Sequence, residues 1–569
     1  MNKIINNNQL RATDEGKYVT LYGFVANKRR FGELNFVDLR DRYGITQLVF
    51  NTPINFTKES CLEVSGKVVI RKDKNDKIDT GEIEILVDKY KVLSSANELP
   101  FPIRDDIDVK EDLRLKYRFL DLRRPVMQNG IILKNKVFAA IREFLQENDF
   151  LELETPILAK ATPEGARDFL VPTRNYNSFF ALPQSPQLFK QLLMASGFER
   201  YYQFARCFRD EDSRKDRQPE FTQLDMEISF VDVEVFQDII ERMFKHFMAK
   251  IGHNITIPFQ RLKFDDCIRD YGSDKPDLRY DNKIVDINDF CNDSEFNIIK
   301  NAPSKRLLHI EEIISKKQFK QLEEIAKKNK VKALFYFTMD NGKILDTNFA
   351  NKVASSVEQL VKSLNKNSGT FLITADKYEF ASQALGALRV ELNSIYNWAR
   401  DEYNFSWIVD WPMFEYDEET NQWQAAHHPF TQFDHDNIDD LEKMDKSQIK
   451  ARSYDLVLNG FELGSGSARI YDKEVQQKMF KFIGMDEQQQ QNKFGFFLKA
   501  FDYAMPPTCG IGLGMDRLIM ILSNNKTIRD VIPFPKNAKN QDVFTEAPSE
   551  ISSEQLSELH IQTIKPKEE

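Results

Sequence analysis

The sequence predicts a multidomain α+β protein that begins with a small all-β barrel. The chain has 569 residues, which at roughly 100–200 residues per domain indicates three or more domains. Residues 17–93 alternate apolar and polar positions, whereas most of the later chain mixes helical and strand patterns. Residues 281–405 carry many Lys and Asn residues and several helical segments, which indicates an inserted domain of the same mixed type.

The N-terminal pattern is that of five β-strands. Val, Ile, Tyr, Phe and Leu alternate with polar residues, as half-buried strands require. Arg42-Tyr43-Gly44 is typical of a tight turn between the second and third strands. Such short strands suit an OB-type barrel, although any small all-β barrel fits the same pattern. The expected strands cover residues 18–27, 34–41, 46–51, 61–72 and 82–93.

Helices and strands alternate after a polar linker. Residues 131–148 predict an amphipathic helix, because Val137, Ile141 and Leu145 recur at helical spacing. Residues 150–156 predict a strand that ends at a proline. The expected boundaries are 1–105 for the barrel and linker, 281–405 for the inserted domain, and 106–280 and 406–569 for the two parts of the remaining domain.

Composition narrows the class of protein. No run of about 18 apolar residues predicts a membrane span and no signal peptide is evident, so we expect a cytoplasmic protein. The five cysteines form no Cys-x-x-Cys pair, which makes a zinc site or a disulfide framework unexpected. The formal charge of −9 argues mildly against nucleic acid, but residues 1–72 hold 12 Lys/Arg and 7 Asp/Glu, a local +5. RNA binding and a solvated basic face explain that local excess equally well.

Two distant segments suggest nucleotide chemistry. Residues 208–225 place a charged loop between apolar segments, which predicts a long hairpin with Arg209 at the end of its first strand and Phe221 at the start of its second. Arginine can hold phosphate through two parallel hydrogen bonds, and phenylalanine can stack on adenine. Residues 506–517 predict a glycine-rich strand that enters a helix and presents Arg517. Each segment alone is weak, because solvated loops and glycine-rich turns are common.

Together these segments resemble motifs 2 and 3 of the class II aminoacyl-tRNA synthetases. The resemblance extends over essentially the whole chain to the aspartate-specific enzymes of the bacterial type. It implies an OB-fold anticodon-binding domain, a class II catalytic domain with an antiparallel sheet, and a homodimer whose interface lies near residues 151–156. It also implies ATP-dependent attachment of L-aspartate to tRNA(Asp), with tRNA(Asn) as an open second acceptor. Further matching segments are residues 162–168, 184–190, 384–389, 427–431 and 460–469.

The resemblance implies a nucleotide site with two catalytic arginines. Arg209 would bridge the aspartate carboxylate and the α-phosphate, and Arg517 would hold the γ-phosphate. Asp455 and Glu462 would hold Mg²⁺, a hard cation that prefers oxygen ligands, although from the residues alone a surface acid pair is the simpler interpretation. The other implied ATP contacts are Asp210, Glu211, Gln218, Phe221, Glu462, Gly514, Met515 and Asp516.

The amino-acid pocket is the more discriminating feature, because aspartate differs from asparagine by one charge. Lys190 and Arg469 match the cationic positions, and Arg469 suits a bidentate grip on the β-carboxylate. The resemblance places Glu164 and Asp225 near the ammonium group. The pocket is completed by Gln187, His427 and Arg209.

In the barrel, Arg29, Phe36 and Gln47 resemble anticodon-reading positions, since OB surfaces stack bases on aromatic rings and read base edges with polar groups. A position in the barrel core is an equally good interpretation of Phe36. Phe31 stands where the family discriminates tRNA(Asp) from tRNA(Asn) and matches neither usual residue. Thr508-Cys509 departs from the histidine and small residue usual in bacterial members, and we expect activity to survive this change.

Three other classes of protein share part of this pattern. Asparagine and lysine ligases share the OB-plus-catalytic layout, but the inserted domain and the Lys190/Arg469 pair favour aspartate. A binding or regulatory protein without catalysis is expected to have lost Arg209, Arg517 or Glu462, and all three are present.

Overall fold

The computed structural model describes residues 5–161, 165–292, 296–349, 353–417, 421–435 and 443–564. The chain divides into two compact units: Met1–Ile132 with Arg529–Ser549, and Leu133–Ile528 with Glu550–Glu569. A segment late in the sequence therefore belongs to the N-terminal unit. The domain boundaries expected at residues 105, 280 and 405 remain predictions.

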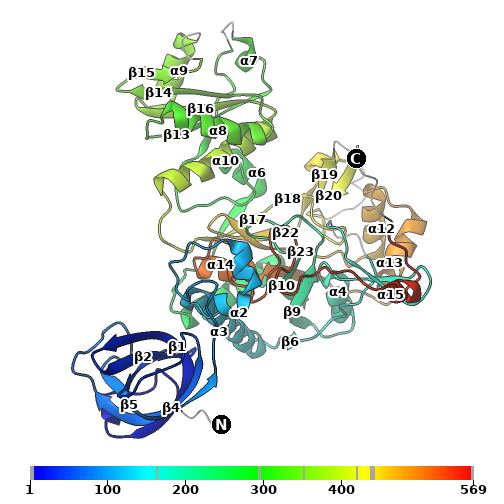
Figure 1. The fold of residues 1–569 in the computed structure, drawn as a ribbon. Coiled ribbons are helices and arrows are strands. Elements are labelled where there is room, and N and C mark those ends of the chain that lie inside the picture. The colour runs from blue at the N-terminus through cyan, green and yellow to red at the C-terminus, as the bar shows by residue number, and fades with distance from the viewer. Residues whose placement is uncertain are drawn as a thin grey trace. The chain divides into compact units, whose positions relative to one another are not determined.

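The first unit contains a closed five-stranded barrel with strand order β1-β2-β3-β5-β4 (Figure 1), which confirms the predicted barrel. Alternate side chains point inward, and Leu21, Val37 and Val64 are fully buried in its core. The strands are β1 (Tyr18–Phe31), β2 (Leu34–Arg40), β3 (Ile45–Phe50), β4 (Cys61–Ile70) and β5 (Ile83–Ser94).

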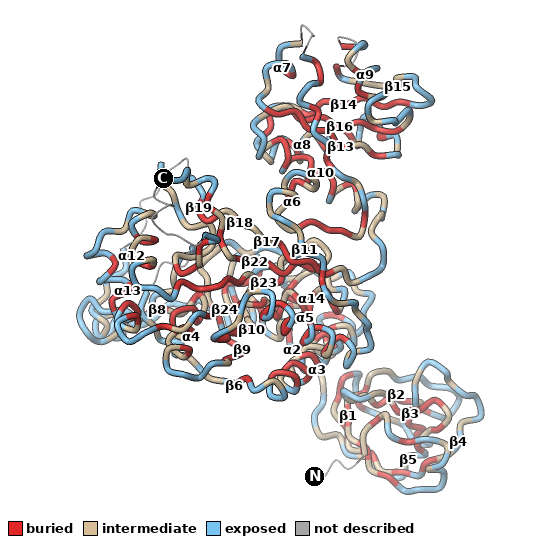
Figure 2. Tube along the Cα trace, turned by 180° about the vertical axis from the view of Figure 1, so that it is seen from behind, coloured by how far each residue is buried: buried red, intermediate tan, exposed pale blue. Residues whose placement is uncertain are grey.

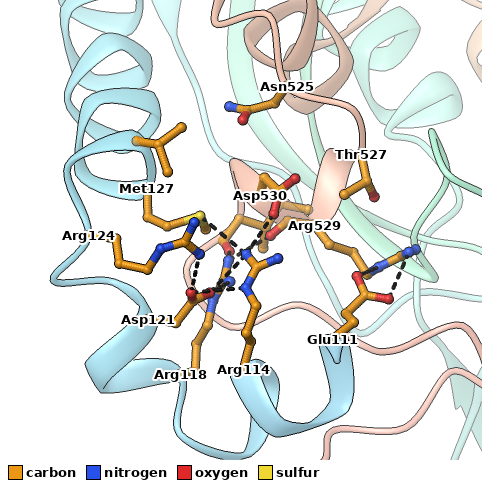
Figure 3. A network of polar contacts seen from close by, with 12 residues as sticks. Glu111, Arg114, Arg118, Asp121, Arg124, Met127, Asn525, Thr527, Arg529 and Asp530 are labelled. Carbon is orange, nitrogen blue, oxygen red and sulfur yellow. Dashed lines mark hydrogen bonds and ion pairs between the residues drawn. The ribbon is translucent and has the colours of Figure 1, made fainter. Parts of the chain in front are cut away.

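A buried carboxylate organises the rest of this unit (Figure 3). Asp121 accepts hydrogen bonds from Arg114 Nε at 3.0 Å, Arg118 Nη1 at 2.7 Å and Arg124 Nη1 at 2.7 Å. Burial acts to raise the pKa of Asp121, but the arginine hydrogen bonds outweigh it and lower this pKa. Arg118 also donates to the carbonyl of Arg529 at 2.6 Å, which fixes the late segment to this unit. The helices are α1 (Glu111–Lys116) and α2 (Arg118–Asp121).

An eight-stranded, largely antiparallel sheet is the centre of the second unit, in the order β11-β17-β22-β23-β24-β10-β9-β6. The predicted hairpin is confirmed, because β9 and β10 pair in antiparallel register from Phe208↔Glu220 to Arg200↔Ile228. The strands are β6 (Leu151–Glu152), β9 (Arg200–Phe208), β10 (Glu220–Ser229), β11 (Gln260–Lys263), β17 (Phe405–Val409), β22 (Ser453–Leu458), β23 (Phe461–Ala468) and β24 (Thr508–Gly514).

Two predicted elements differ in length from those observed. Helix α3 (Pro125–Glu147) starts six residues earlier than expected, at a proline that suits the first helical position. The strand expected over 150–156 is limited to β6, because the N–H of Thr155 bonds the side chain of Gln203 at 2.9 Å and Pro156 has no N–H.

The helices that support the site surround this sheet. Helix α5 buries a face of Phe236, Ile240, Phe244 and Phe247. Helix α14 follows β24 directly, as the glycine-rich segment predicts. The helices are α4 (Gln187–Ala195), α5 (Val233–Lys250), α6 (Phe264–Tyr271), α12 (Lys473–Phe482), α13 (Glu487–Phe501), α14 (Met515–Leu522) and α15 (Ser553–Glu558). The short strands are β7 (Leu170–Pro172), β8 (Phe179–Ala181), β18 (Trp411–Pro412), β19 (Phe414–Asp417), β20 (Gln422–Ala425) and β21 (Lys450–Ala451).

The segment expected to be an insertion forms its own five-stranded sheet, in the order β12-β13-β16-β14-β15. Both faces of the sheet are buried, since Leu308 and Tyr336 belong to one hydrophobic cluster and Leu307 and Phe337 to another. Figure 2 shows the buried residues concentrated along these strands. The elements are β12 (Ile284–Asp286), α7 (Asn297–Lys300), β13 (Ser304–Ile310), α8 (Lys316–Lys328), β14 (Leu334–Asp340), β15 (Lys343–Thr347), α9 (Ala354–Leu364), β16 (Gly369–Asp376) and α10 (Tyr378–Tyr396).

Candidate active site

A cavity of about 290 Å³ in the second unit contains most of the predicted site residues. Its walls come from α4, the β9–β10 hairpin, β23, β24, the start of α14 and the segment around His427. A larger hollow of about 1170 Å³ exists in the same unit, but none of the predicted site residues lines it. The predicted residues that line the smaller cavity are Gln187, Lys190, Arg209, Glu211, Gln218, Phe221, Asp225, His427, Glu462, Arg469, Gly514, Asp516 and Arg517.

Among the described residues, three that are expected at the active site, Asp210, Met515 and Asp455, do not line the cavity. Glu164 lies outside the described residues. Asp210 donates its N–H to Arg167 O at 3.0 Å and its carboxylate lies 3.7 Å from the Arg167 side chain. The side chain of Met515 is fully buried. Asp455 is also buried, and its Oδ1 lies 3.4 Å from His427 Nε2.

One end of the cavity has a buried set of two cations and two carboxylates. Lys190 Nζ lies 2.8 Å from Asp225 Oδ1 and 3.5 Å from Glu227 Oε2. Arg469 grips Glu227 with two hydrogen bonds, Nε to Oε1 at 3.0 Å and Nη2 to Oε2 at 3.1 Å. All four side chains are at most 2 % exposed. Arg469 is therefore held in a bidentate geometry, as predicted, but its partner here is Glu227.

The pKa values of the two acids are shifted in opposite directions. Burial raises the pKa of Asp225 despite the nearby Lys190. The pKa of Glu227 is lowered, because Arg469 and Lys190 together outweigh the effect of burial. Glu227 is thus the carboxylate that stays ionised and keeps the two cations in place.

His428 was missed by the sequence reasoning, which selected only its neighbour. Its Nε2 accepts a hydrogen bond from Arg469 Nη1 at 2.6 Å, and its Nδ1 lies 3.3 Å from Thr431 Oγ1. Burial and the adjacent Arg469 lower the pKa of His428 well below its usual value, so the imidazole is neutral. The N–H of Phe430 also points at Nδ1, at 3.2 Å, so hydrogen-bond donors approach both ring nitrogens. Glu227 was missed as well, although its position two residues after Asp225 places both on one face of β10.

The other end of the cavity presents two arginines. Arg209 lies over the Phe221 ring, with its guanidinium carbon 5.2 Å from the ring centroid. Its buried Nε has no hydrogen-bond acceptor among the described residues, and the same is true of Arg517 Nε. Arg517 contacts Asp216 at 3.2 Å and the carbonyl of Glu462. Two guanidinium groups with unused donors at a cavity wall suit an anionic ligand.

The acids at this end have distinct environments. Asp516 accepts the N–H of Thr222 at 2.8 Å and pairs with Lys134, so its carboxylate holds α14 against β10 and α3. Burial, and next the neighbouring Asp455 carboxylate, raise the pKa of Glu462. The oxygen atoms of two neighbouring carboxylates suit a hard cation, which would offset the repulsion between them.

The predicted barrel residues share an outer face. Phe36 is partly exposed and lies outside the barrel core, so the core interpretation of this ring is wrong, and its contact with the anticodon stays a prediction. Arg29 Nη2 donates to Gln47 Oε1 at 3.2 Å and to Asp38 Oδ1 at 3.0 Å. Gln47 is largely buried, so it orients Arg29 more than it meets solvent. Phe31 is 81 % exposed near the tip of the β1–β2 hairpin.

Comparison with known families agrees with this geometry. The family model described as tRNA synthetases class II (D, K and N) matches residues 110–538, and that of the OB-fold nucleic acid binding domain matches residues 19–93. Fold and site therefore define a class II aminoacyl-tRNA synthetase with an N-terminal OB fold.

Sequence relatives identify the branch. The chain is 47 % identical over 565 residues to an aspartate–tRNA ligase of Malacoplasma penetrans, covering 97 % of both chains. It is also 47 % identical over 574 residues to an aspartate–tRNA(Asp/Asn) ligase of Caldanaerobacter subterraneus, again covering 97 % of both. The chain belongs to the aspartate–tRNA ligase family, and as a member it is an aminoacyl-tRNA ligase that uses ATP as a substrate.

Solved structures share the fold at lower identity. The asparaginyl-tRNA synthetase of Pyrococcus horikoshii, complexed with asparaginyl-adenylate, has a TM-score of 0.59 at 19 % identity and covers 94 % of this chain and 98 % of its own. The aspartyl-tRNA synthetase of Entamoeba histolytica has a TM-score of 0.54 at 18 % identity and covers 92 % and 90 %. These likenesses show the common architecture alone.

Proposed function

We propose that the cavity activates L-aspartate with ATP and then transfers it to the 3′-terminal adenosine of tRNA(Asp). The observation that carries the proposal is the juxtaposition of a buried carboxylate-binding pair, Lys190 and Arg469, with the two arginines Arg209 and Arg517 in one cavity. The first group suits an acidic side chain, and the second suits the phosphates of ATP.

Charge balance at the amino-acid end favours aspartate over asparagine. Lys190 and Arg469 are two buried cations at this end, and Glu227 neutralises one of these charges, which leaves +1 (2 − 1). L-Aspartate carries two carboxylates and one ammonium group, a net charge of −1, and neutralises this set. Asparagine is neutral overall and leaves one buried cation uncompensated, which is costly.

The residues then have defined tasks in the reaction. Lys190 and Arg469 hold the β-carboxylate, and Asp225 holds the ammonium group, with Glu164, Gln187 and His427 completing the pocket. The α-carboxylate oxygen attacks the α-phosphorus, the new P–O bond forms, and the bond to pyrophosphate breaks. Arg209 stabilises the charge that develops there, and Arg517 holds the γ-phosphate. The tRNA hydroxyl next attacks the aspartyl carbonyl carbon, and AMP leaves.

The remaining nucleotide contacts follow from position in the cavity. Glu211 and Gln218 face the ATP side, and Phe221 offers a ring for adenine. Asp455 and Glu462 would hold Mg²⁺, which would neutralise phosphate charge and align the leaving group. Met515 and Asp516 support the site from inside the protein. The Met515 side chain is buried in the core, and the Asp516 carboxylate accepts the N–H of Thr222.

The direct test is ATP–pyrophosphate exchange with aspartate, asparagine and lysine in turn. Exchange with aspartate alone is expected, whereas equal exchange with asparagine would contradict the pocket assignment. Relatives named for tRNA(Asp) and for tRNA(Asp/Asn) are equally similar, so aminoacylation of both purified tRNAs follows as the second assay.

Because charged tRNA is used by cytoplasmic ribosomes, we place the activity in the cytoplasm. No helix among the described residues is long and apolar enough to span a bilayer.

We propose that the outer face of the barrel reads the anticodon. Phe36→Ala is expected to raise the KM for tRNA(Asp) on the order of ten-fold, since base stacking on an aromatic ring is worth about 1–3 kcal/mol. Aspartate-dependent pyrophosphate exchange without tRNA should not change. Tyr18→Ala, which removes an exposed ring from the neighbouring strand β1, is the matched control. An unchanged tRNA KM in Phe36→Ala would remove this ring from the interface.

We also propose a homodimer that buries the region around β6 and the β7–β8 hairpin. Leu151 lies on the edge strand of the main sheet, and Leu170, Phe179 and Phe180 on the hairpin are each more than 40 % exposed. Exposed large apolar side chains, and an unpaired sheet edge, are typical of an interface. Phe179→Asp should shift the sedimentation mass from dimer to monomer, whereas Tyr503→Asp, at an exposed ring elsewhere, should not. A dimeric Phe179→Asp variant would place the interface elsewhere.

A further inference from the structure

Thr508 contacts the aspartate pocket through both its main chain and its side chain. Its carbonyl oxygen accepts the N–H of Arg469 at 2.9 Å. Its hydroxyl donates to Glu227 Oε1 at 3.0 Å, and Glu227 in turn grips the Arg469 guanidinium. One residue of β24 therefore fixes the arginine at its backbone and, through a carboxylate, at its charged end.

The hydroxyl has a defined place among the donors to Glu227. Oε1 receives Arg469 Nε and Thr508 Oγ1, while Oε2 receives Arg469 Nη2 and lies 3.5 Å from Lys190 Nζ. Thr508 is 3 % exposed and Glu227 is fully buried, so water has no ready access to replace the hydroxyl. A carboxylate that loses this donor keeps its charge but loses one constraint on its rotation.

The strand is shaped around the same ion pair two residues later. A Cβ at Gly510 would lie 1.6 Å from Glu227 Oε2 and 2.7 Å from Arg469 Nη2. The glycine expected to let the backbone approach a ligand thus makes room for Glu227 and Arg469. Positions 508 and 510 lie on one face of β24. Thr508 supplies a hydroxyl there, and Gly510 leaves room because it has no side chain.

We propose that Thr508 is a positioning residue for amino-acid selection: it locks Glu227, and Glu227 aims Arg469 at the β-carboxylate. This inference rests on the proposed aspartate pocket. Position 508 is where this sequence departs from the histidine usual in bacterial members. The proposal makes the Thr508 hydroxyl part of the discrimination between aspartate and asparagine. The hydrogen bonds of Thr508 go to Glu227 and Arg469 at the amino-acid end of the cavity, so ATP binding should not depend on this residue.

The test compares variants that differ in the hydroxyl. Thr508→Val keeps the branched shape, and the KM for aspartate should rise about ten-fold, the size expected for one lost hydrogen bond to a charged group. The KM for ATP should stay unchanged, and the ratio of kcat/KM for aspartate over asparagine should fall. Thr508→Ser should restore both values. Cys509→Ala is the control, because this buried thiol faces Val231 O on the other side of the strand.

The outcomes separate this inference from the function on which it rests. If Arg469→Leu loses aspartate activation but Thr508→Val keeps the wild-type aspartate KM and selectivity, Thr508 has no positioning role. If Arg469→Leu leaves the aspartate KM unchanged, the proposed pocket itself is wrong. If Thr508→Val does not fold, Thr508→Ala and Thr508→Ser supply the same comparison, since both lack the methyl group and only serine keeps the hydroxyl. Equal aspartate KM values in that pair would overturn the proposal.

Discussion

Arg209→Ala is expected to lower ATP–pyrophosphate exchange by at least roughly 10²-fold, with a range of about 10²–10³-fold typical for one positioned transition-state donor. The side chain follows β9 and lies over Phe221 at the cavity wall. Its buried Nε lacks an acceptor among the described residues, so the donor is available for ligand. Charge on the α-phosphate grows as the carboxylate attacks, and this donor acts where that charge grows.

A neighbouring arginine supplies the control for that experiment. Arg206 belongs to β9, the strand that Arg209 follows, but it pairs with Glu220 at 2.6 Å and does not line the cavity. Arg206→Ala should therefore exchange pyrophosphate almost as well as wild type. The measurement is exchange at saturating aspartate and ATP, with thermal unfolding to confirm that both variants fold. Near-normal exchange in Arg209→Ala would contradict the catalytic assignment.

Arg469→Leu is expected to lose aspartate activation far more than ATP binding. The β-carboxylate would enter a buried pocket with Lys190 as its remaining cation. Removing one partner of a buried ion pair typically costs about 3–5 kcal/mol, because the other charge stays uncompensated. Discrimination against asparagine should shrink in the same variant, since asparagine presents no charge to compensate.

The structure adds a second consequence to this substitution. Arg469 also neutralises Glu227, so the leucine variant leaves a fully buried carboxylate with Lys190 at 3.5 Å and Thr508 as its neighbours. We therefore expect lower thermal stability as well as lower activity. Arg469→Lys separates the two effects, because it keeps the charge but cannot make the bidentate contact. Its fold should survive, while its KM for aspartate rises.

Both Michaelis constants in the exchange assay decide the assignment. A raised aspartate KM with an unchanged ATP KM is expected for Arg469→Lys. The opposite pattern, a raised ATP KM with an unchanged aspartate KM, would show that Arg469 serves the phosphates instead. That result would remove the amino-acid pocket from this end of the cavity.

The sequence was informative where chemistry follows from local pattern. The alternation of apolar and polar residues predicted the five barrel strands. The charged loop between two apolar segments predicted the β9–β10 hairpin, with Arg209 at the end of its first strand. Motif resemblance then selected residues that meet in one cavity, although Arg517 lies far along the chain from Arg209. Local pattern was less reliable for the strand over 150–156, because the Thr155 N–H donates to the Gln203 side chain instead of to a strand partner.

The sequence by itself determined the barrel, the nucleotide-binding segments and the family resemblance. It also determined which cationic residues are expected to bind the β-carboxylate and the phosphates. Only the tertiary structure decided how those charges are arranged. Glu227, His428 and Thr508 could not be recognised in isolation, because their roles come from contacts with Arg469 made across β10, β23 and β24. The same holds for Asp516, whose carboxylate supports α14. Burial is the physical reason: away from water, a charged group takes its role from the partners that the fold places within hydrogen-bond distance.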